Sequence, residues 1–279
     1  MRTFLFSSVV VLVASAAFAQ QRPLVTEDPE TIGAGRLLLE GGVEYGRDAV
    51  YPVSGLRGNL WRLPLIGISV GVSSIAEIQI DQASFSHLDI TSRRPGPLTG
   101  LVTATGSSTT DTDDLLIGAK IRIAPERTRR PAFGFRFATK LPNANNESGL
   151  GLDTTDFFAS VLAGKTTESV RIVGNIGFGI LGDPTNGNRQ NDVLTYGLSF
   201  ARAITNAAEV VGEVNGRANT RSAGPLPGTE SRSIIRMGLR YTTGGWRGDG
   251  AVLIGATSND PDIGFAAGFT YAFTAFQVP

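Results

Sequence analysis

The chain has 279 residues, no cysteine, and 25 basic residues against 25 acidic ones, so its formal net charge is zero. The lack of cysteine excludes a disulfide framework and a lipid-modified N-terminal cysteine. The balanced charge argues against a nucleic-acid-binding protein, which would carry a basic domain or patch. Glycine is plentiful, at 35 residues, and helix-period segments are scarce, which favours an all-β fold.

The N-terminus has the features of an export signal. Arg2 precedes an apolar run over residues 4–14, and small residues follow at Ala17 and Ala19. This pattern predicts a secretory signal peptide, residues 1–19, that is cleaved after Ala19. The alternative is a membrane anchor, but the apolar run is too short to span a bilayer comfortably.

Further along the chain, apolar and polar residues alternate with a period of two. In "DDLLIGAKIRIA", residues 113–124, the leucine and isoleucine side chains fall on one face, while Lys120 and Arg122 fall on the other. Twelve segments follow such a pattern and are predicted as strands: 36–46, 58–72, 76–90, 113–124, 132–142, 154–165, 169–182, 191–203, 208–218, 231–242, 245–257 and 262–276. Many have ten or more residues, about the length that a tilted strand needs to cross a bilayer, whereas strands of soluble proteins are commonly about five or six residues long.

The connections between these segments alternate in length. Those after even-numbered segments are short, as at 166–168 and 243–244, and most of the others are longer, as at 91–112 and 219–230. This arrangement predicts a transmembrane antiparallel up-and-down β-barrel of about 12 strands, with short periplasmic turns, longer extracellular loops and both termini in the periplasm. We expect residues 36–276 to form it.

A soluble β-sandwich or barrel is the alternative, since it would bury the same apolar face that a membrane barrel presents to lipid. The membrane form is favoured by glycines on the polar face and by aromatic residues placed toward the ends of strands on the apolar face. Those aromatic residues are Tyr45, Trp61, Tyr196, Tyr241, Tyr271 and Phe273. Ahead of the barrel, residues 20–35 are expected to be a periplasmic N-terminal segment, either a disordered lead-in or one that partly occludes the periplasmic mouth.

Four stretches resemble a known family: "RPLVTEDPET" (22–31), "LWRLPLIGISVGVSSIAEIQID" (60–81), "DDLLIGAK" (113–120) and "TKLPNANNESGLGLDTTDF" (139–157). Together they are similar to the outer-membrane family of the MetA-pathway of phenol degradation, whose members are also described as transporters. The resemblance implies a twelve-stranded barrel and transport of small organic compounds, and it supplies no catalytic residues.

Polar residues on the inward face are the candidates for a pore lining. They are Glu40, Glu44, Glu77, Asp81, Lys120, Arg122, Arg136, Lys140, Arg171, Asn175, Glu213, Asn215, Arg217, Arg236 and Arg240. Acidic and basic members concentrate on different strands, so they could create a transverse field across a pore. Alternatively, they pair across neighbouring strands and fill a lumen of intermediate width.

Three motifs suggest other chemistry. His87, the only histidine, with Ser84 and Ser86 nearby, allows an outer-membrane lipid hydrolase. The acidic group Asp111–Asp114 could contribute to a Ca²⁺ site, but it lacks the glycine and distal glutamate of a calcium loop. "ASVLAGKTT", residues 159–167, and "GFGILG", residues 177–182, have the spacing of nucleotide-binding turns. Both lie in alternating strands with no helix after them, so we interpret them as barrel elements.

We therefore expect a porin-like protein of the outer membrane of a Gram-negative bacterium that passes small, aromatic or hydrophobic, solutes without catalysis. A structural or adhesive barrel that does not conduct is the main alternative, and the lipid hydrolase centred on His87 is a further one. The expected partners are outer-membrane lipid and a small-molecule solute, with no nucleic acid, no cofactor and no metal. The oligomeric state is left open.

Overall fold

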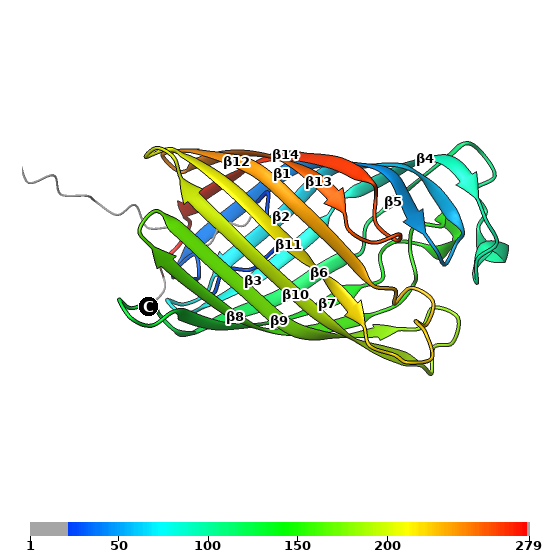
Figure 1. The fold of residues 1–279 in the computed structure, drawn as a ribbon, viewed down its shortest axis with the longest axis horizontal. Helices are drawn as coiled ribbons and strands as arrows, with labels where there is room; N and C mark the ends of the chain where they lie inside the picture. The colour runs from blue at the N-terminus through cyan, green and yellow to red at the C-terminus, as the bar shows by residue number, and fades with distance from the viewer. Residues whose placement is uncertain (1–21, 278–279) are drawn as a thin grey trace, which may run out of the picture.

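Antiparallel pairing connects each strand to its neighbour around a closed ring (Figure 1), as described for residues 22–277 by a computed structural model. The predicted signal peptide and its cleavage site lie outside the described residues. The strands are β1 (Arg36–Tyr51), β2 (Leu56–Gly71), β3 (Ala76–Ala83), β4 (Phe85–Arg93), β5 (Ser108–Thr112), β6 (Leu115–Ala124), β7 (Ala132–Leu141), β8 (Asp156–Thr167), β9 (Val170–Gly182), β10 (Gln190–Ala203), β11 (Ala208–Asn219), β12 (Arg232–Thr243), β13 (Trp246–Gly255) and β14 (Ile263–Thr274).

Two positions in the ring hold interrupted strands. β2 pairs with β4 from Leu56 to Arg62 and with β3 from Ile66 to Gly71, so β3 and β4 form one strand that is broken at Ser84. β5 and β6 likewise occupy one position, because β5 pairs with β4 and β6 pairs with β3. β1 pairs with both β2 and β14 and closes the ring. Fourteen strands minus these two breaks give twelve positions, so the predicted all-β barrel of about 12 strands is confirmed.

The connections differ at the two ends of the barrel. At one end, where β1 begins and β14 ends, they are two to seven residues long: 72–75, 125–131, 168–169, 204–207 and 244–245. At the other end most are longer: 52–55, 94–107, 142–155, 183–189, 220–231 and 256–262. In outer-membrane barrels the short turns face the periplasm, and we name the two ends accordingly.

One predicted loop is partly wrong. Residues 91–112 were expected to form a single extracellular loop, but β4 continues to Arg93, and residues 108–112 pair with it as β5. Thr109, Thr110 and Thr112 are β-branched residues that suit an extended strand, and β4 offers them a free edge beyond the membrane wall. A short 3₁₀ helix, Thr99–Leu101, interrupts the remaining loop, and a second one, Asn146–Ser148, lies in the loop between β7 and β8. Within residues 22–277, no helix is long and apolar enough to cross a membrane.

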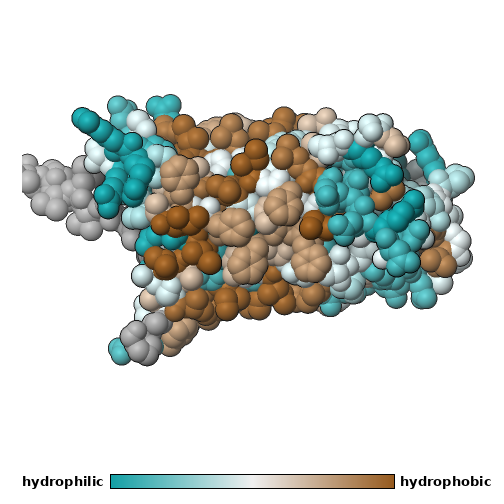
Figure 2. All heavy atoms as spheres, turned by 90° about the horizontal axis from the view of Figure 1, so that it is seen from below, coloured by the Kyte–Doolittle hydropathy of each residue, from teal (hydrophilic) through white to brown (hydrophobic). Residues whose placement is uncertain are grey.

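The outer wall is an apolar band with polar ends (Figure 2). Tyr45, Trp61 and Phe265 contact one another near the extracellular edge, with ring centroids 4.7–5.8 Å apart. Trp246 stacks on Tyr271 near the periplasmic edge at 4.3 Å. Aromatic residues at both edges of an apolar band are characteristic of membrane barrels.

Tyr196 does not follow this pattern. It faces outward from the middle of β10, opposite Ile176 and Gly216, rather than lying near a strand end.

Candidate functional site

The residues before β1 lie inside the barrel. Residues 22–35, here called the inner segment, form hydrogen bonds or ion pairs with β3, β6, β7, β9, β11, β12, β13 and β14. A stretch this short can contact strands on every side of a closed ring only from within the ring. These contacts are those of an occluding segment, not of a disordered lead-in.

Glycines on the inner face leave room for the inner segment. A Cβ built on Gly197 would lie 2.8 Å from the hydroxyl oxygen of Thr26, which is too close for an unshifted side chain. Pro29 lies similarly close to Gly134 and Gly164, at 3.1 and 3.0 Å from the corresponding Cβ positions. The inward glycines, which in the sequence favoured a membrane barrel, therefore leave space at these positions for a chain segment inside it.

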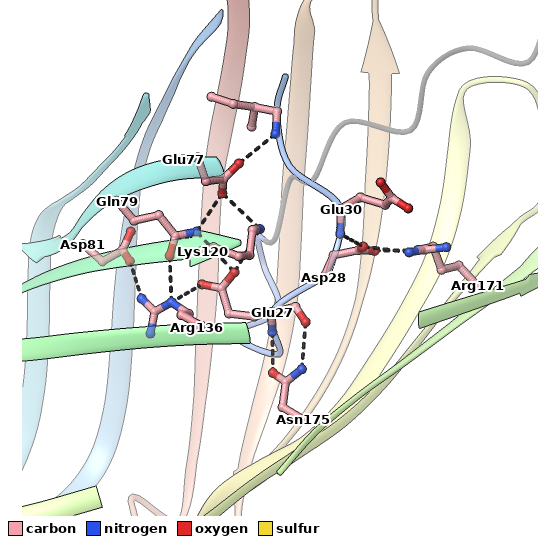
Figure 3. A network of polar contacts seen from close by, with 11 residues as sticks. Glu27, Asp28, Glu30, Glu77, Gln79, Asp81, Lys120, Arg136, Arg171 and Asn175 are labelled. Carbon is pink, nitrogen blue, oxygen red and sulfur yellow. Dashed lines mark hydrogen bonds and ion pairs between the residues drawn. The ribbon is translucent and has the colours of Figure 1, made fainter. Parts of the chain in front are cut away.

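The centre of the contact is the carboxylate of Glu27 (Figure 3). Its Oε2 lies 3.3 Å from the ammonium of Lys120, and its Oε1 lies 3.0 Å from Nε of Arg136. Lys120 also pairs with Glu77 at 3.0 Å, and Gln79 donates hydrogen bonds to Glu27 and Glu77. The Lys120 side chain is 0% exposed, so its charge depends entirely on these partners.

A second set of contacts fixes the rest of the inner segment. Arg171 donates through Nη2 to Asp28 at 2.7 Å, and Arg122 pairs with Glu30 at 2.6 Å. Asn175 accepts the N–H of Glu27 at 2.7 Å and donates to its carbonyl at 2.8 Å, which copies the pairing of a neighbouring strand. The backbone is thus held as well as the side chains.

All fifteen candidate residues lie on the inward face of their strands, opposite the exposed apolar side chains. Eight of them bond directly to the inner segment: Glu77, Lys120, Arg122, Arg136, Arg171, Asn175, Glu213 and Arg240. Five others bond within the wall: Glu44, Asp81, Lys140, Asn215 and Arg236. Glu40 accepts from the hydroxyl of Thr270, and Arg217 donates to backbone carbonyls. Neighbouring charges therefore pair extensively.

Glu27, Asp28 and Glu30 were not among the residues predicted from the sequence to line the lumen. Three carboxylates within four positions directly ahead of the first strand are a signal that could have been used, since the candidate lining contains more bases than acids on β6, β7 and β9. Arg62 was not predicted either, and it pairs with Glu44 at 2.8 Å and with Asp113 at 3.2 Å.

Two cavities lie above the inner segment. The middle cavity, about 450 Å³, has Arg22–Val25 and Glu27 in its wall together with charged residues of the strands. The outer cavity, about 440 Å³, lies nearer the extracellular loops. Glu44, Tyr51, Arg62, Gln82 and Leu150 line both cavities, so they mark where the two adjoin.

The comparisons with known proteins agree with this architecture. Residues 21–274 match the family described as "Putative MetA-pathway of phenol degradation". The chain belongs to this family. The resemblance drawn from its sequence is confirmed.

Among solved structures, this family member is similar to an outer-membrane channel from Pseudomonas putida F1. The TM-score is 0.61 at 10% identity, over 88% of this chain and 98% of the channel. It is also similar to the translocator domain of the autotransporter NalP from Neisseria meningitidis, with a TM-score of 0.51 at 13% identity over 86% and 89% of the two chains. At these identities the likeness shows the fold alone. No curated protein matches the chain.

The Ser–His pair considered for a hydrolase is not formed in this family member. Ser84 and Ser86 donate their hydroxyls to Asp113, the latter at 2.5 Å. His87 projects to the opposite face of β4, where its Nδ1 lies 2.7 Å from the hydroxyl of Thr110. Because successive side chains of a strand point to opposite faces, Ser86 and His87 lie on different sides of β4.

The acidic group 111–114 has separate partners. Asp111 accepts the N–H of Asn145, Asp113 accepts from the two serines, and Asp114 pairs with Lys140. Across the described part of the chain, no group of three or more histidine, aspartate or glutamate side chains is arranged to hold a metal ion.

The phosphate-loop motif, residues 159–167, forms the end of strand β8 and the start of a hairpin turn. Lys165 and Thr166 lie where β8 turns into β9, and both bond to the carboxylate of Glu126, at 3.0 Å and 2.8 Å. "GFGILG" lies within β9. In the described part of the chain, strand β9 follows the first motif and the loop 183–189 follows the second, as expected from the sequence.

Proposed function

We propose that this protein is a passive channel of the outer membrane for small organic solutes, with the inner segment as its constriction. The observation that carries the proposal is the arrangement of the two adjoining cavities. They lead from the extracellular loops through Glu44, Tyr51 and Arg62 to the inner segment. A barrel wall built only for anchorage would have no need of cavities in series along its axis.

In this proposal, the inner segment sets the width of the pathway. It is joined to the wall by hydrogen bonds and ion pairs, so it can shift without breaking a covalent bond. Lumenal charges that meet its carboxylates, such as Lys120 and Arg136, hold the closed arrangement. A solute passes when these contacts loosen on the side of the lumen that it occupies.

The fifteen inward residues are proposed as the pore lining, with those free of the inner segment acting on the solute above it. Outer-membrane lipid is the proposed partner of the apolar band. The chain would reach this membrane by export, with residues 1–19 removed after Ala19.

Support from the comparisons is of two kinds. The chain belongs to a family whose description names phenol degradation, and phenol is a small aromatic compound. The similar structure from Pseudomonas putida is described as a channel. The aromatic or hydrophobic character of the solute is part of the proposal.

Planar-bilayer recording of the refolded protein tests the function. A channel gives discrete conductance steps in KCl that are absent from bilayers treated with detergent alone. A folded barrel that gives no step under any voltage or salt concentration would favour the structural or adhesive alternative instead.

A further inference from the structure

Two arginines in the outer cavity lack carboxylate partners. Arg217 on β11 and Arg232 on β12 are directly opposite each other in the strand register, and both line this cavity. Elsewhere in the lumen, basic side chains such as Lys120 and Arg236 meet carboxylates at 3.0 Å. Within the described residues, no ion pair of 4.0 Å or less includes Arg217 or Arg232.

Backbone carbonyls hold the two guanidinium groups in place. Arg217 donates to the carbonyls of Glu230 and Gly228, at 3.0 and 2.9 Å. Arg232 donates to the carbonyl of Val50 at 2.9 Å. A guanidinium has five N–H donors, so these contacts orient each group and leave donors for another acceptor.

Three carboxylates share the cavity wall, and each has another partner. Glu44 pairs with Arg62 at 2.8 Å, and the other two accept backbone N–H groups. Glu230 accepts the N–H of Gly228 at 3.1 Å, and Asp260 accepts that of Ser233 at 2.9 Å. Like charges on directly opposed residues of a sheet are destabilising, and a bound anion between them would relieve that repulsion.

The remainder of the cavity wall is largely apolar. Tyr51, Leu150, Leu152, Ile234 and Leu253 contribute to it, in a cavity of about 440 Å³. A ligand that fits both features has one negative charge and a compact apolar body.

We infer that Arg217 and Arg232 form a binding site for small apolar carboxylates, such as a single aromatic ring that bears one carboxylate. The carboxylate oxygens take the free N–H donors of the two guanidinium groups, and the ring packs against Tyr51 and the leucines. This inference rests on the proposed function and adds the class of solute, since the site lies on the extracellular side of the inner segment. Bound solute would be concentrated at the entrance of the pathway.

Calorimetric titration of the full mature chain in detergent tests the site with three probes: benzoate, benzyl alcohol and acetate. Benzoate has both the ring and the charge, while each of the other two lacks one of them. Benzoate should bind at least about tenfold more tightly than either, since charge-assisted hydrogen bonds and ring burial both contribute. Equal binding of benzoate and benzyl alcohol, or no binding of benzoate, would overturn the inference.

Variants identify the residues. R217Q and R232Q should each weaken benzoate binding by about tenfold or more and leave benzyl alcohol unchanged. R202Q removes the same charge from an exposed position on the outer face of β10 and should bind as the wild type does. R217K and R232K, which keep the charge, should retain part of the affinity. An equal loss in R202Q and R217Q would overturn the assignment. Conductance of each variant in KCl is recorded separately, so a failed binding site is distinguished from a failed channel.

Discussion

Oε2 of Glu27 lies 3.3 Å from Nζ of Lys120, although 93 residues separate them in the chain. This contact joins the inner segment to the wall of the barrel at a point where both side chains are shielded from water. Because Lys120 also meets Glu77, one buried ammonium is shared by a carboxylate of the wall and a carboxylate of the inner segment. The position of the inner segment is therefore coupled to the charge balance of the lumen.

Replacing Glu27 by glutamine should loosen the inner segment. Removing one partner of a buried ion pair commonly costs about 3–5 kcal/mol, and the remaining pair of Lys120 with Glu77 reduces this loss. We expect the single-channel open probability to rise several-fold. Asp262→Asn, which neutralises an exposed carboxylate in an extracellular loop, is the matched control. The same open probability in E27Q and D262N would refute a role for the contact in closure.

Arg236→Glu should shift ion preference toward cations. Arg236 pairs with Glu213 at 3.0 Å and lies 3.8 Å from Glu44, so a third carboxylate there makes this part of the lumen strongly negative. The reversal potential in a KCl gradient reports the change. Arg202→Glu, with the same charge change on the outer wall, should leave it unaltered. An unchanged potential in R236E would remove this residue from the pathway.

The depth of the membrane band can be tested with two isoleucines of equal exposure. Ile176, in the middle of β9, and Ile204, in a periplasmic turn, are both 60% exposed. Ile176→Arg should lower the free energy of unfolding from lipid vesicles by about 2–4 kcal/mol, and Ile204→Arg by about 0–1 kcal/mol. Equal losses would mean that Ile176 does not face the hydrocarbon.

The strands and their faces were predictable because apolar and polar residues alternate along most strands in the way that a membrane barrel requires. For example, Ile121 and its neighbour Arg122 point to opposite faces of the strand, so the apolar side chain predicts the lipid face and the charged one the lumenal face. The break at Ser84 was not predictable. Gln82 adopts a positive φ of 63° there, and no glycine at that position indicates such a backbone conformation in the sequence. The predicted strand 76–90 therefore passed over it.

The inner segment was harder to predict for a different reason. Arg22 donates a hydrogen bond to the carbonyl of Ala267, 245 residues away. The residue pattern of 22–35 does not indicate contacts with residues so distant in the chain. The clue was one of charge: Glu27, Asp28 and Glu30 complement Lys120, Arg171 and Arg122. The alternation of the strands therefore predicts which residues face the lumen, but not which residues of the inner segment they contact.

Stability at acid pH should depend on Glu126 in the periplasmic turn 125–131. Burial alone would raise the pKa of this carboxyl, but hydrogen bonds from the N–H of Thr166, from Lys165 and from Arg171 outweigh it and lower the pKa. A pKa that is lower in the folded state stabilises the fold above the unfolded pKa of about 4.3, and this stabilisation is lost as pH falls through the folded value.

The wild type and E126Q should therefore differ most in unfolding midpoint near neutral pH and converge as the pH drops below about 4. Urea unfolding of the two proteins at several pH values measures the difference. A gap between the midpoints that stays constant from neutral to acid pH would show that the carboxylate charge does not contribute.

The central claim is that the inner segment controls the pathway, and a single engineered disulfide tests it most directly. Thr26 Cβ lies 3.4 Å from the Cβ position built on Gly197, close to the separation of about 3.5–4.5 Å that a disulfide requires. The chain has no cysteine of its own, so a T26C/G197C variant can form only this intramolecular bond. Single-channel conductance is recorded with the bond oxidised and after reduction. We predict that conductance steps are suppressed when the bond is closed and return on reduction. Equal conductance in the two states, with the crosslink verified by mass spectrometry, would contradict the claim.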